Sequence, residues 1–429
     1  MIPTRLYLFG QVTDTNNDIK CNELKANNVQ KLSILRSFKP LLKRLHSHAD
    51  CHNRKLHYDQ YVSLILLYFF NPTLTGLRSI QHASTLKSVQ TKLGIKRTSL
   101  GSMSEASHVF DPQLLTLIIS ELAGEVGSLD IYKRLQDLDM TVVAVDGTLL
   151  KALPKMLWAL WLDEDHRAAK MHLEFDILKG APLRAQVTDA NANEKTQLKS
   201  SLSPGKLYCL DAGYREYRLL DTIIETKSSF VVCLQDNASY QTVEEHQLSE
   251  ADREVGVKFD RTVWLGSKQK HDNISKPTCP NRYRRVRIIQ IHYFDERTLS
   301  GYKRKSRVSS KKTFRTRSPE HTLLIATDRM DLPAELIGLI YRYRWQIELF
   351  FRWFKCILSC QHLLSLSQNG IQIQVYCALI ASLLIRLWAG RKPTKRTFEM
   401  ICLYFQGWAT LDELIKHIEL LKSNDQKQK

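Results

Sequence analysis

Hydrophobic positions recur every three or four residues in the first third of the chain, which predicts helices there. Breaks rich in Gly, Pro and polar residues separate four such segments. The segments are QKLSILRSFKPLLKRLH, HYDQYVSLILLYFF, LRSIQHASTLKSVQTKLGI and DPQLLTLIISELAGEV. This spacing places the apolar side chains on one face of each helix. We therefore predict an all-helical region at 31–135, preceded by a polar, flexible arm at 1–30.

The third segment and the residues after it are typical of a helix-turn-helix. A helix is followed by the turn GIKRTSLGS, and a Ser before the next helical run is a favourable N-cap. In DNA-binding units of this kind, the second helix enters the major groove. A plain helical bundle with basic turns gives the same pattern, so both interpretations stay open.

From residue 140 the hydrophobic pattern becomes that of strands. Short β-branched or alternating runs occur at MTVVAVDGTLL, KMHLEFDILKG, APLRAQVTDA, KLYCLDAGY and SFVVCLQD, with helical runs at NEKTQLKSSL and EYRLLDTIIET. This order predicts an α/β sheet of mixed direction over 140–236. Shorter β-like pieces with basic turns follow at 237–320. One more strand, HTLLIATD, and a helix follow at 321–365, and 366–429 reads as helical.

A long helix is predicted over 331–359, because its apolar residues recur at helical spacing after an early Pro. Four polar residues occur in it at relative positions 0, 3, 7 and 14: Tyr341, Arg344, Glu348 and Lys355. These offsets place the side chains within roughly 60° of one another on one face. Arg352 joins this face. A carboxylate among cations and a phenol suits the binding of DNA phosphates, although a surface ladder of ion pairs gives the same pattern.

Composition indicates a basic globular protein with room for two or three domains. The chain has 429 residues, of which 43% are hydrophobic and 25% charged, and its net charge is +18. The segment Arg261–Glu320 holds 17 Lys and Arg against 4 Asp and Glu, so most of the excess charge lies there. Such a charge points toward polyanions without distinguishing nucleic acid from an anionic membrane.

Cysteine usage and the apolar segments predict a cytoplasmic protein without a membrane span. Nine cysteines without a CxxC spacing argue against a disulfide framework. The N-terminal apolar stretch is too short for a secretory signal. The most apolar run, 375–388, is too short to cross a bilayer and contains Arg386, which predicts a buried core helix.

A cluster of histidines and a cysteine in the helical region has no standard zinc-site spacing. Its members are His46, His48, Cys51, His52 and His57. We therefore favour a polar turn between helices over a metal site.

Two acidic residues follow predicted strands. Asp146 occurs in VVAVDG and Asp211 in LYCLDAG. Ligand sites of α/β sheets lie at the carboxyl ends of strands, where a packed helix would deliver Glu348. Phosphodiester cleavage is served by two Mg²⁺ ions about 3.5–4 Å apart, and a few carboxylates suffice to hold them. Each Asp alone is more often part of a turn, whereas their combination with Glu348 favours a metal site.

These motifs resemble those of the DDE transposases of the IS4 family. The family signature Tyr-x2-Arg-x3-Glu-x6-Lys matches without a gap at Tyr341, Arg344, Glu348 and Lys355. VDGT around Asp146 resembles the first-acid region of the family, and LDAGY around Asp211 resembles the second. The resemblance covers about 140–365 well and the helical N-terminal region more loosely.

The resemblance implies a ribonuclease H-like catalytic core at 140–236 and 321–365. A basic, β-rich insertion at 237–320 would interrupt this core. A helical DNA-binding domain at 31–135 would precede it, and C-terminal helices at 366–429 would follow.

The resemblance also implies roles for the site residues. The catalytic acids would be Asp146, Asp211 and Glu348, holding two Mg²⁺ ions for which Mn²⁺ would substitute. The DNA-binding residues would be Tyr341, Arg344, Arg352 and Lys355. Trp264, Tyr293 and Phe294 are candidates for stacking on a flipped base, although sheet core is the simpler interpretation. Glu194 is a candidate accessory acid, although stabilisation of a helix dipole is the simpler one.

The activity implied is that of an insertion-sequence transposase. It would bind inverted-repeat ends, cut and paste the element through hairpin ends, and join the ends to target DNA. A homodimer in the synaptic complex, a place at the bacterial nucleoid in the cytoplasm, and no membrane partner are expected. The alternatives are a ribonuclease H-like nuclease without strand transfer and an inactive, transposase-derived DNA-binding protein.

Overall fold

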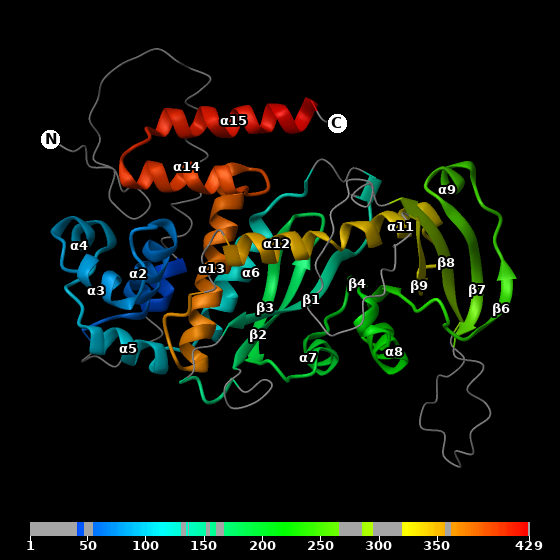
Figure 1. Cartoon of the computed structure of the whole chain (residues 1–429), viewed down its shortest axis with the longest axis horizontal. Coiled ribbons are helices and arrows are strands. Elements are labelled where there is room, and N and C mark those ends of the chain that lie inside the picture. The colour runs from blue at the N-terminus through cyan, green and yellow to red at the C-terminus, as the bar shows by residue number, and fades with distance from the viewer. Residues whose placement is uncertain are drawn as a thin grey trace, which may run out of the picture. The chain divides into compact units, whose positions relative to one another are not determined.

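The structure is a computed structural model of the chain (Figure 1). It describes residues 41–46, 55–129, 134–135, 137–151, 155–159, 167–265, 285–294, 320–356 and 362–427. The chain forms two compact units. Unit 1 comprises Met1–Tyr132, Gly147–Ala192 and Gln346–Lys429, and unit 2 comprises Lys133–Asp146 and Asn193–Trp345.

Helices dominate unit 1, and one of them, α13, is almost entirely buried. They are α2 (Tyr58–Phe70), α3 (Leu77–Ala83), α4 (Lys87–Leu93), α5 (Leu100–Val109), α6 (Gln113–Glu125), α12 (Gln346–Cys356), α13 (Gln368–Ala389), α14 (Lys395–Gln406) and α15 (Leu411–Lys427). α13 packs against α2, α5, α6 and the strand β3 (Figure 1). The helical region predicted at the start of the chain is therefore confirmed for its described residues.

α13 is the core helix predicted at 375–388, and it is longer than predicted. Its length and composition would allow it to cross a membrane, but 89% of its most apolar window is buried inside the structure, as in the core helix of a soluble protein. Arg386 is also buried, and its guanidinium donates to the carbonyls of Lys179 and Gly127, at 3.3 and 3.0 Å. Burial lowers the pKa of Arg386 to about 10.

The helix predicted at LRSIQHASTLKSVQTKLGI is interrupted, so the prediction of one continuous helix there is wrong. α3 ends at Ala83 and α4 begins at Lys87. Buried Ser84 lies between them; its hydroxyl donates to the Gln81 carbonyl and accepts from the Thr98 amide, at 2.6 and 3.1 Å. Such side-chain bonds compete with helix continuation. The predicted Ser cap is confirmed, because Ser99 Oγ accepts from the Ser102 amide at 3.0 Å.

The described strands form one sheet of mixed direction, as predicted. They are β1 (Thr141–Lys151), β2 (Ala168–Asp176), β3 (Ala181–Asp189), β4 (Lys206–Leu210), β5 (Ser229–Cys233), β6 (Tyr240–Glu245), β7 (Val257–Leu265), β8 (Arg285–Phe294) and β9 (Glu320–Thr327). Their order is β3-β2-β1-β4-β5-β9-β8-β7-β6. β1, β4 and β5 are parallel, whereas β2 with β3 and the run from β5 through β9, β8 and β7 to β6 are antiparallel.

Unit 2 carries short helices around its part of the sheet. They are α7 (Glu194–Ser201), the 3-10 turn η2 (Ala212–Tyr214), α8 (Tyr217–Glu225), α9 (Glu250–Glu254) and α11 (Ala334–Tyr343). α8 is the crossover that lets β5 lie parallel to β4.

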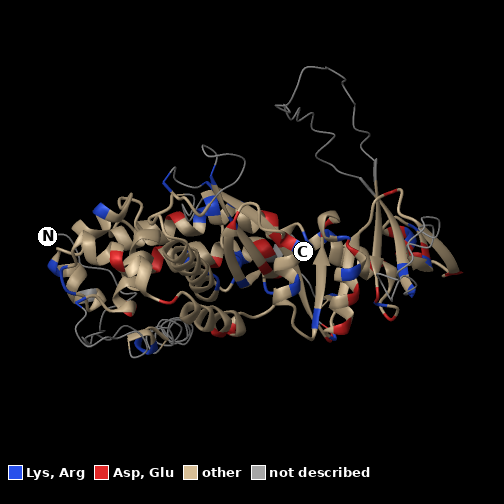
Figure 2. Ribbon diagram, turned by 90° about the horizontal axis from the view of Figure 1, so that it is seen from below, with Lys and Arg blue, Asp and Glu red and all other residues tan. Residues whose placement is uncertain are grey.

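The described strands of 237–320 continue the same sheet. β9 provides the join, since Thr327 lies opposite Val231 of β5 and also opposite Arg287 of β8. Of the 17 basic residues in the segment that starts at Arg261, 14 lie outside the described residues. Along the described ribbon, basic and acidic residues are intermixed (Figure 2).

Gly256, just before β7, occupies a position that only glycine fits. Its φ is +88°, and an added Cβ would lie 2.2 Å from the His292 carbonyl oxygen. The two residues are also joined by a hydrogen bond from the His292 amide to the Gly256 carbonyl, at 2.8 Å. The close approach of His292 in β8 to residue 256 is therefore possible only because Gly256 has no side chain.

We predict that Gly256→Ala lowers the free energy of unfolding by about 3 kcal/mol, because left-handed strain and a backbone clash add together. Gly205→Ala is the matched control: its φ is +75°, but nothing lies within 4 Å of an added Cβ. It should cost about 1 kcal/mol. Urea unfolding measures both, and equal losses would contradict the argument from the clash.

Candidate active site

Asp146 and Asp211 lie at equivalent positions of two neighbouring parallel strands. The pairing of β1 with β4 ends at Ala144 opposite Cys209, and each Asp comes two residues after its member of that pair. Residues two apart on extended backbone point to the same side, and paired strands lie about 4.8 Å apart. Asp211 keeps an extended backbone, with φ −79° and ψ 177°. The two carboxylates are therefore neighbours on one side of the sheet.

Buried Tyr214 lies beside both carboxylates. Burial raises the pKa of its phenol, and the negative charges of Glu194, Asp146 and Asp211 raise it further. The same phenol is hydrogen-bonded with the Glu194 side chain. Glu194 begins α7, in the first turn where it stabilises the helix dipole as predicted. Glu194 is therefore hydrogen-bonded with a phenol that lies near both Asp residues.

The two Asp residues differ in where they lie relative to the ends of their strands. Asp146 was predicted to end its strand, but β1 continues to Lys151, so both that prediction and the alternative of an Asp-Gly turn are wrong. β1 lies between β2 and β4 in the sheet and extends five residues beyond Asp146. Asp211 does follow the end of β4, and its Oδ1 accepts from the Gly213 amide at 2.8 Å. That hydrogen bond to Oδ1 fixes the orientation of the Asp211 carboxylate.

The prediction of one uninterrupted helix over 331–359 is wrong. α11 ends at Tyr343 and α12 begins at Gln346. Between them, the Arg344 amide donates to the Tyr341 carbonyl, three residues back, at 3.1 Å. This tighter turn ends the regular α-helical pattern. The face defined by the signature is thus divided, with Tyr341 and Arg344 in unit 2 and the later residues in unit 1.

The end of α11 is held by β4 and β5. Burial raises the pKa of the Cys209 thiol to about 12, and this protonated thiol donates to the Ile340 carbonyl at 3.7 Å. The half-buried Tyr341 side chain is hydrogen-bonded with the Cys233 thiol. Cys209 precedes Asp211 by two residues, so α11 covers the side of β4 on which Asp211 lies.

Arg344 lies at this same end of α11. Its guanidinium carbon is 5.8 Å from the centroid of the Tyr341 ring. Its positive charge acts on the thiols of Cys209 and Cys233 and lowers their pKa values against the larger effect of burial. The structure thus brings Arg344 to the side of β4 and β5 that α11 covers.

α12 in unit 1 carries the other three predicted site residues. Glu348, Arg352 and Lys355 are spaced by four and three residues, which places them on one face. Arg352 is exposed and the other two are half-buried. Elsewhere on α12 the aromatic side chains are buried, with the Phe350 ring 5.2 Å from Phe175 of β2. The apolar face of α12 is therefore buried, and Glu348, Arg352 and Lys355 lie on its other, less buried face.

The remaining candidates are described only in part. Trp264 is half-buried on β7, and the side chains of Tyr293 and Phe294 lie outside the described residues. In the histidine cluster, His46 Nδ1 lies 3.0 Å from Asp59 Oδ1, and the His46 and His57 rings are 4.3 Å apart. The other members of that cluster lie outside the described residues. Across the described ranges, no three His, Cys, Asp or Glu side chains converge into a metal site.

The sequence matches a known protein family over most of this region. The profile of the family described as "Transposase DDE domain" matches residues 137–384, which is more than half of the chain. The match includes all seven predicted site residues. It begins before β1 and ends within α13.

Curated relatives of this chain are also named as transposases. The putative transposase y4zB of Sinorhizobium fredii is 28% identical over 225 residues, which are 52% of this chain and 54% of the relative. The probable transposase for IS5377 of Geobacillus stearothermophilus is 24% identical and covers 70% of each chain. The transposase for IS231C of Bacillus thuringiensis is 24% identical and covers 72% of this chain and 67% of its own.

A solved structure with detectable likeness is a piggyBac transposase synaptic complex with hairpin DNA. It is 8% identical, with a TM-score of 0.37, and the match covers 84% of this chain and 74% of that one. A score of this size supports no argument about the fold. The family assignment therefore rests on the sequence match and the relatives. On these grounds the chain belongs to the transposase DDE domain family and is a DNA transposase of the IS4 family.

Proposed function

We propose that this transposase binds the inverted-repeat ends of an insertion sequence and catalyses metal-dependent cleavage and strand transfer on them. The observation that carries the proposal is the pair of carboxylates, Asp146 and Asp211, at matching positions of parallel β1 and β4. The side of β4 that carries Asp211 also faces the end of α11, with Arg344. Paired acids beside a cation suit chemistry on a phosphodiester.

The proposed architecture is a ribonuclease H-like catalytic core at 140–236 and 321–365. The order β3-β2-β1-β4-β5, with three parallel strands beside an antiparallel pair, supports it. The segment 237–320 is the insertion, 31–135 the helical DNA-binding domain, and 366–429 the C-terminal helices. The arm predicted at 1–30 lies outside the described residues.

Asp146, Asp211 and Glu348 are the residues that would hold two divalent ions, Mg²⁺ or Mn²⁺ in its place. Their carboxylate oxygens are the hard ligands that such ions prefer, and the half-exposed Asp pair leaves room for a substrate oxygen. When bound, the ions would stabilise the charge on the attacking and leaving oxygens of the phosphodiester. Gly213 orients Asp211 through its amide, and Tyr214 holds Glu194 beside the pair.

Arg344, Arg352 and Lys355 bind backbone phosphates of the DNA end, and Tyr341 assists. A guanidinium presents a planar fork of N–H donors that matches two phosphate oxygens. The Tyr341 ring lies beside the Arg344 guanidinium, and its hydroxyl is hydrogen-bonded with Cys233. The main role of Tyr341 is therefore to hold the Arg344 guanidinium in position.

The proposed reaction is cut-and-paste transposition through hairpin ends. Water cleaves one strand, and the freed 3′-hydroxyl attacks the opposite strand to form a hairpin. A second water opens the hairpin, and the 3′-end then attacks target DNA. Bringing two ends together requires a homodimer in the synaptic complex. The protein acts in the bacterial cytoplasm, held at the nucleoid through its DNA contacts.

We predict that Asp146→Asn, Asp211→Asn and Glu348→Gln each reduce cleavage and strand transfer by about a thousandfold, because each removes a charge that stabilises the reacting centre. The assay incubates each full-length variant and Mg²⁺ with a plasmid carrying the element's inverted-repeat ends. Binding to the ends without metal should change by less than about twofold, since the phosphate-binding cations remain.

Glu245→Gln is the matched control for these variants. It removes a carboxylate from the surface of β6, where Glu245 is paired with Arg261 at 3.1 Å. It should leave both steps unchanged. Full activity of Asp146→Asn would overturn the metal-site assignment, and cleavage without joining by the unmodified protein would indicate a nuclease instead.

We also predict that Arg344→Ala weakens binding to end DNA by about tenfold, the effect of losing one charge-assisted hydrogen bond. The slope of log affinity against log salt should become shallower by about 0.9, because one phosphate contact is lost. Arg342→Ala, on the exposed surface of the same helical turn, removes the same charge and is the control. Equal effects of the two substitutions would show that only net charge matters.

A further inference from the structure

The first turn of α11 is tied to the strands and helix of the insertion. Asp252, buried in α9, accepts a hydrogen bond from the Glu335 amide through Oδ1, at 2.9 Å. Its Oδ2 accepts from the amide and hydroxyl of Ser249, at 3.0 and 2.7 Å. A carboxylate of the insertion thus caps the positive end of the helix that leads to Arg344.

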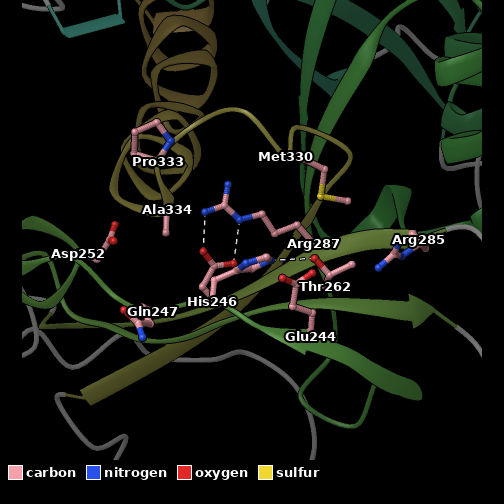
Figure 3. Close-up of a pocket in the computed structure, with 11 residues that line it drawn as sticks. Glu244, His246, Gln247, Asp252, Thr262, Arg285, Arg287, Met330, Pro333 and Ala334 are labelled. Atoms are coloured by element: carbon pink, nitrogen blue, oxygen red, sulfur yellow. Dashed lines mark hydrogen bonds and ion pairs between the residues drawn. The ribbon is translucent and has the colours of Figure 1, made fainter.

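A buried ion pair holds the segment that leads into α11. Arg287 of β8 donates through Nε to Asp260 of β7 at 2.7 Å, and its Nη2 donates to the other oxygen of the same carboxylate. Its Nη1 donates to the backbone carbonyls of Leu332 and Arg329. One guanidinium therefore joins two strands of the insertion to the residues just before the helix. Figure 3 shows the hydrogen bonds of the Arg287 guanidinium as dashed lines and labels Ala334 at the start of α11.

Gly338 of α11 also lies close to Ile291 of β8. A Cβ added to Gly338 would lie 2.4 Å from Cδ1 of Ile291. Beside the ion pair, by contrast, a cavity of about 500 Å³ opens, lined by residues that include Glu244, His246, Thr262 and Arg285. Apolar packing does not surround the pair on that side, so its hydrogen bonds fix the geometry there.

The two ends of α11 are therefore held by different parts of unit 2. The insertion holds the first turn, and β4 and β5 hold the last turn through Cys209 and Cys233. A helix of 10 residues is a rod about 15 Å long, so a change of angle at one end moves the other. The placement of Arg344 depends on contacts that lie at the far end of the helix.

We propose that Arg287 and Asp260, with Asp252, are positioning residues for the contact of Arg344 with the DNA end. The insertion then sets the angle of α11 in addition to any DNA contacts of its own. The proposal rests on the proposed role of Arg344 in phosphate binding. A merely structural role predicts a different pattern of affinities, because loss of stability would not depend on the presence of Arg344.

The test is a double-mutant cycle on the full-length protein, with a duplex of the element's inverted-repeat end as the probe. The variants are Arg287→Gln, Arg344→Ala and the combination of the two. We expect Arg287→Gln to weaken end binding by about tenfold and to make the salt slope shallower by about 0.9, as Arg344→Ala does. The combined variant should bind no more weakly than Arg344→Ala, since the two changes remove the same contact.

Two further variants control for the loss of a positive charge and for the loss of stability. Arg261→Gln breaks a partly exposed pair with Glu245 in the same sheet and should change neither affinity nor slope. Arg287→Lys keeps the buried charge, and it should retain cooperative unfolding even if Arg287→Gln does not. Because an ammonium cannot grip Asp260 in a fork and also reach the Leu332 carbonyl, this variant should still show the shallower slope.

The outcomes separate the two proposals. If the effect of Arg287→Gln or Arg287→Lys adds in full to that of Arg344→Ala, or is absent while Arg344→Ala weakens binding, the positioning role is wrong. If Arg344→Ala alone leaves end binding unchanged, the phosphate-binding role is wrong, and the positioning role falls with it.

Discussion

The parallel pairing of β1 with β4 is the constraint on which the candidate site depends. Parallel strands need a crossover, so residues far apart in the sequence come to lie level with one another. Here Ala144 lies opposite Cys209, and the register alone makes neighbours of Asp146 and Asp211. A shift of one residue would turn one carboxylate to the other side of the sheet. The apolar residues that bury both strands therefore also determine the geometry of the acids.

Much of this arrangement was open to prediction from periodicity. Strands with continuous apolar runs, such as LYCL before Asp211, are specified locally, and so is the apolar α13. The order of these elements indicated a mixed sheet. The signature predicted the candidate site residues, because its spacing is a property of the sequence alone.

Other features depend on partners that the local sequence does not specify. β1 extends beyond Asp146 although Asp-Gly favours a turn, since pairing in a sheet outweighs a local turn preference. Ser84 separates α3 from α4 through a hydrogen bond with Thr98, a residue 14 positions away. Glu194 was predicted to be a helix-end charge or an accessory acid, but its hydrogen bond with Tyr214 could not be predicted, because α7 and η2 follow different strands.

The charges of the insertion illustrate a similar limit. Its composition indicated a surface for polyanions, and 14 of its basic residues lie outside the described part. Arg261 and Arg287, however, are engaged with Glu245 and Asp260. A count of basic residues therefore overstates the number that face a ligand. A buried basic residue such as Arg287 stabilises the fold, whereas only an exposed one can contact DNA.

The turn between α11 and α12 has a consequence for the signature itself. Tyr341 and Arg344 belong to one compact unit, and Glu348 belongs to the other. Only Trp345 separates Arg344 from Gln346, and two residues of extended chain span at most about 7 Å. This short connection limits how far Arg344 can lie from the start of α12. The proposed phosphate-binding and metal-binding residues of the signature therefore stay linked along the chain, although the turn divides the helix that carries them.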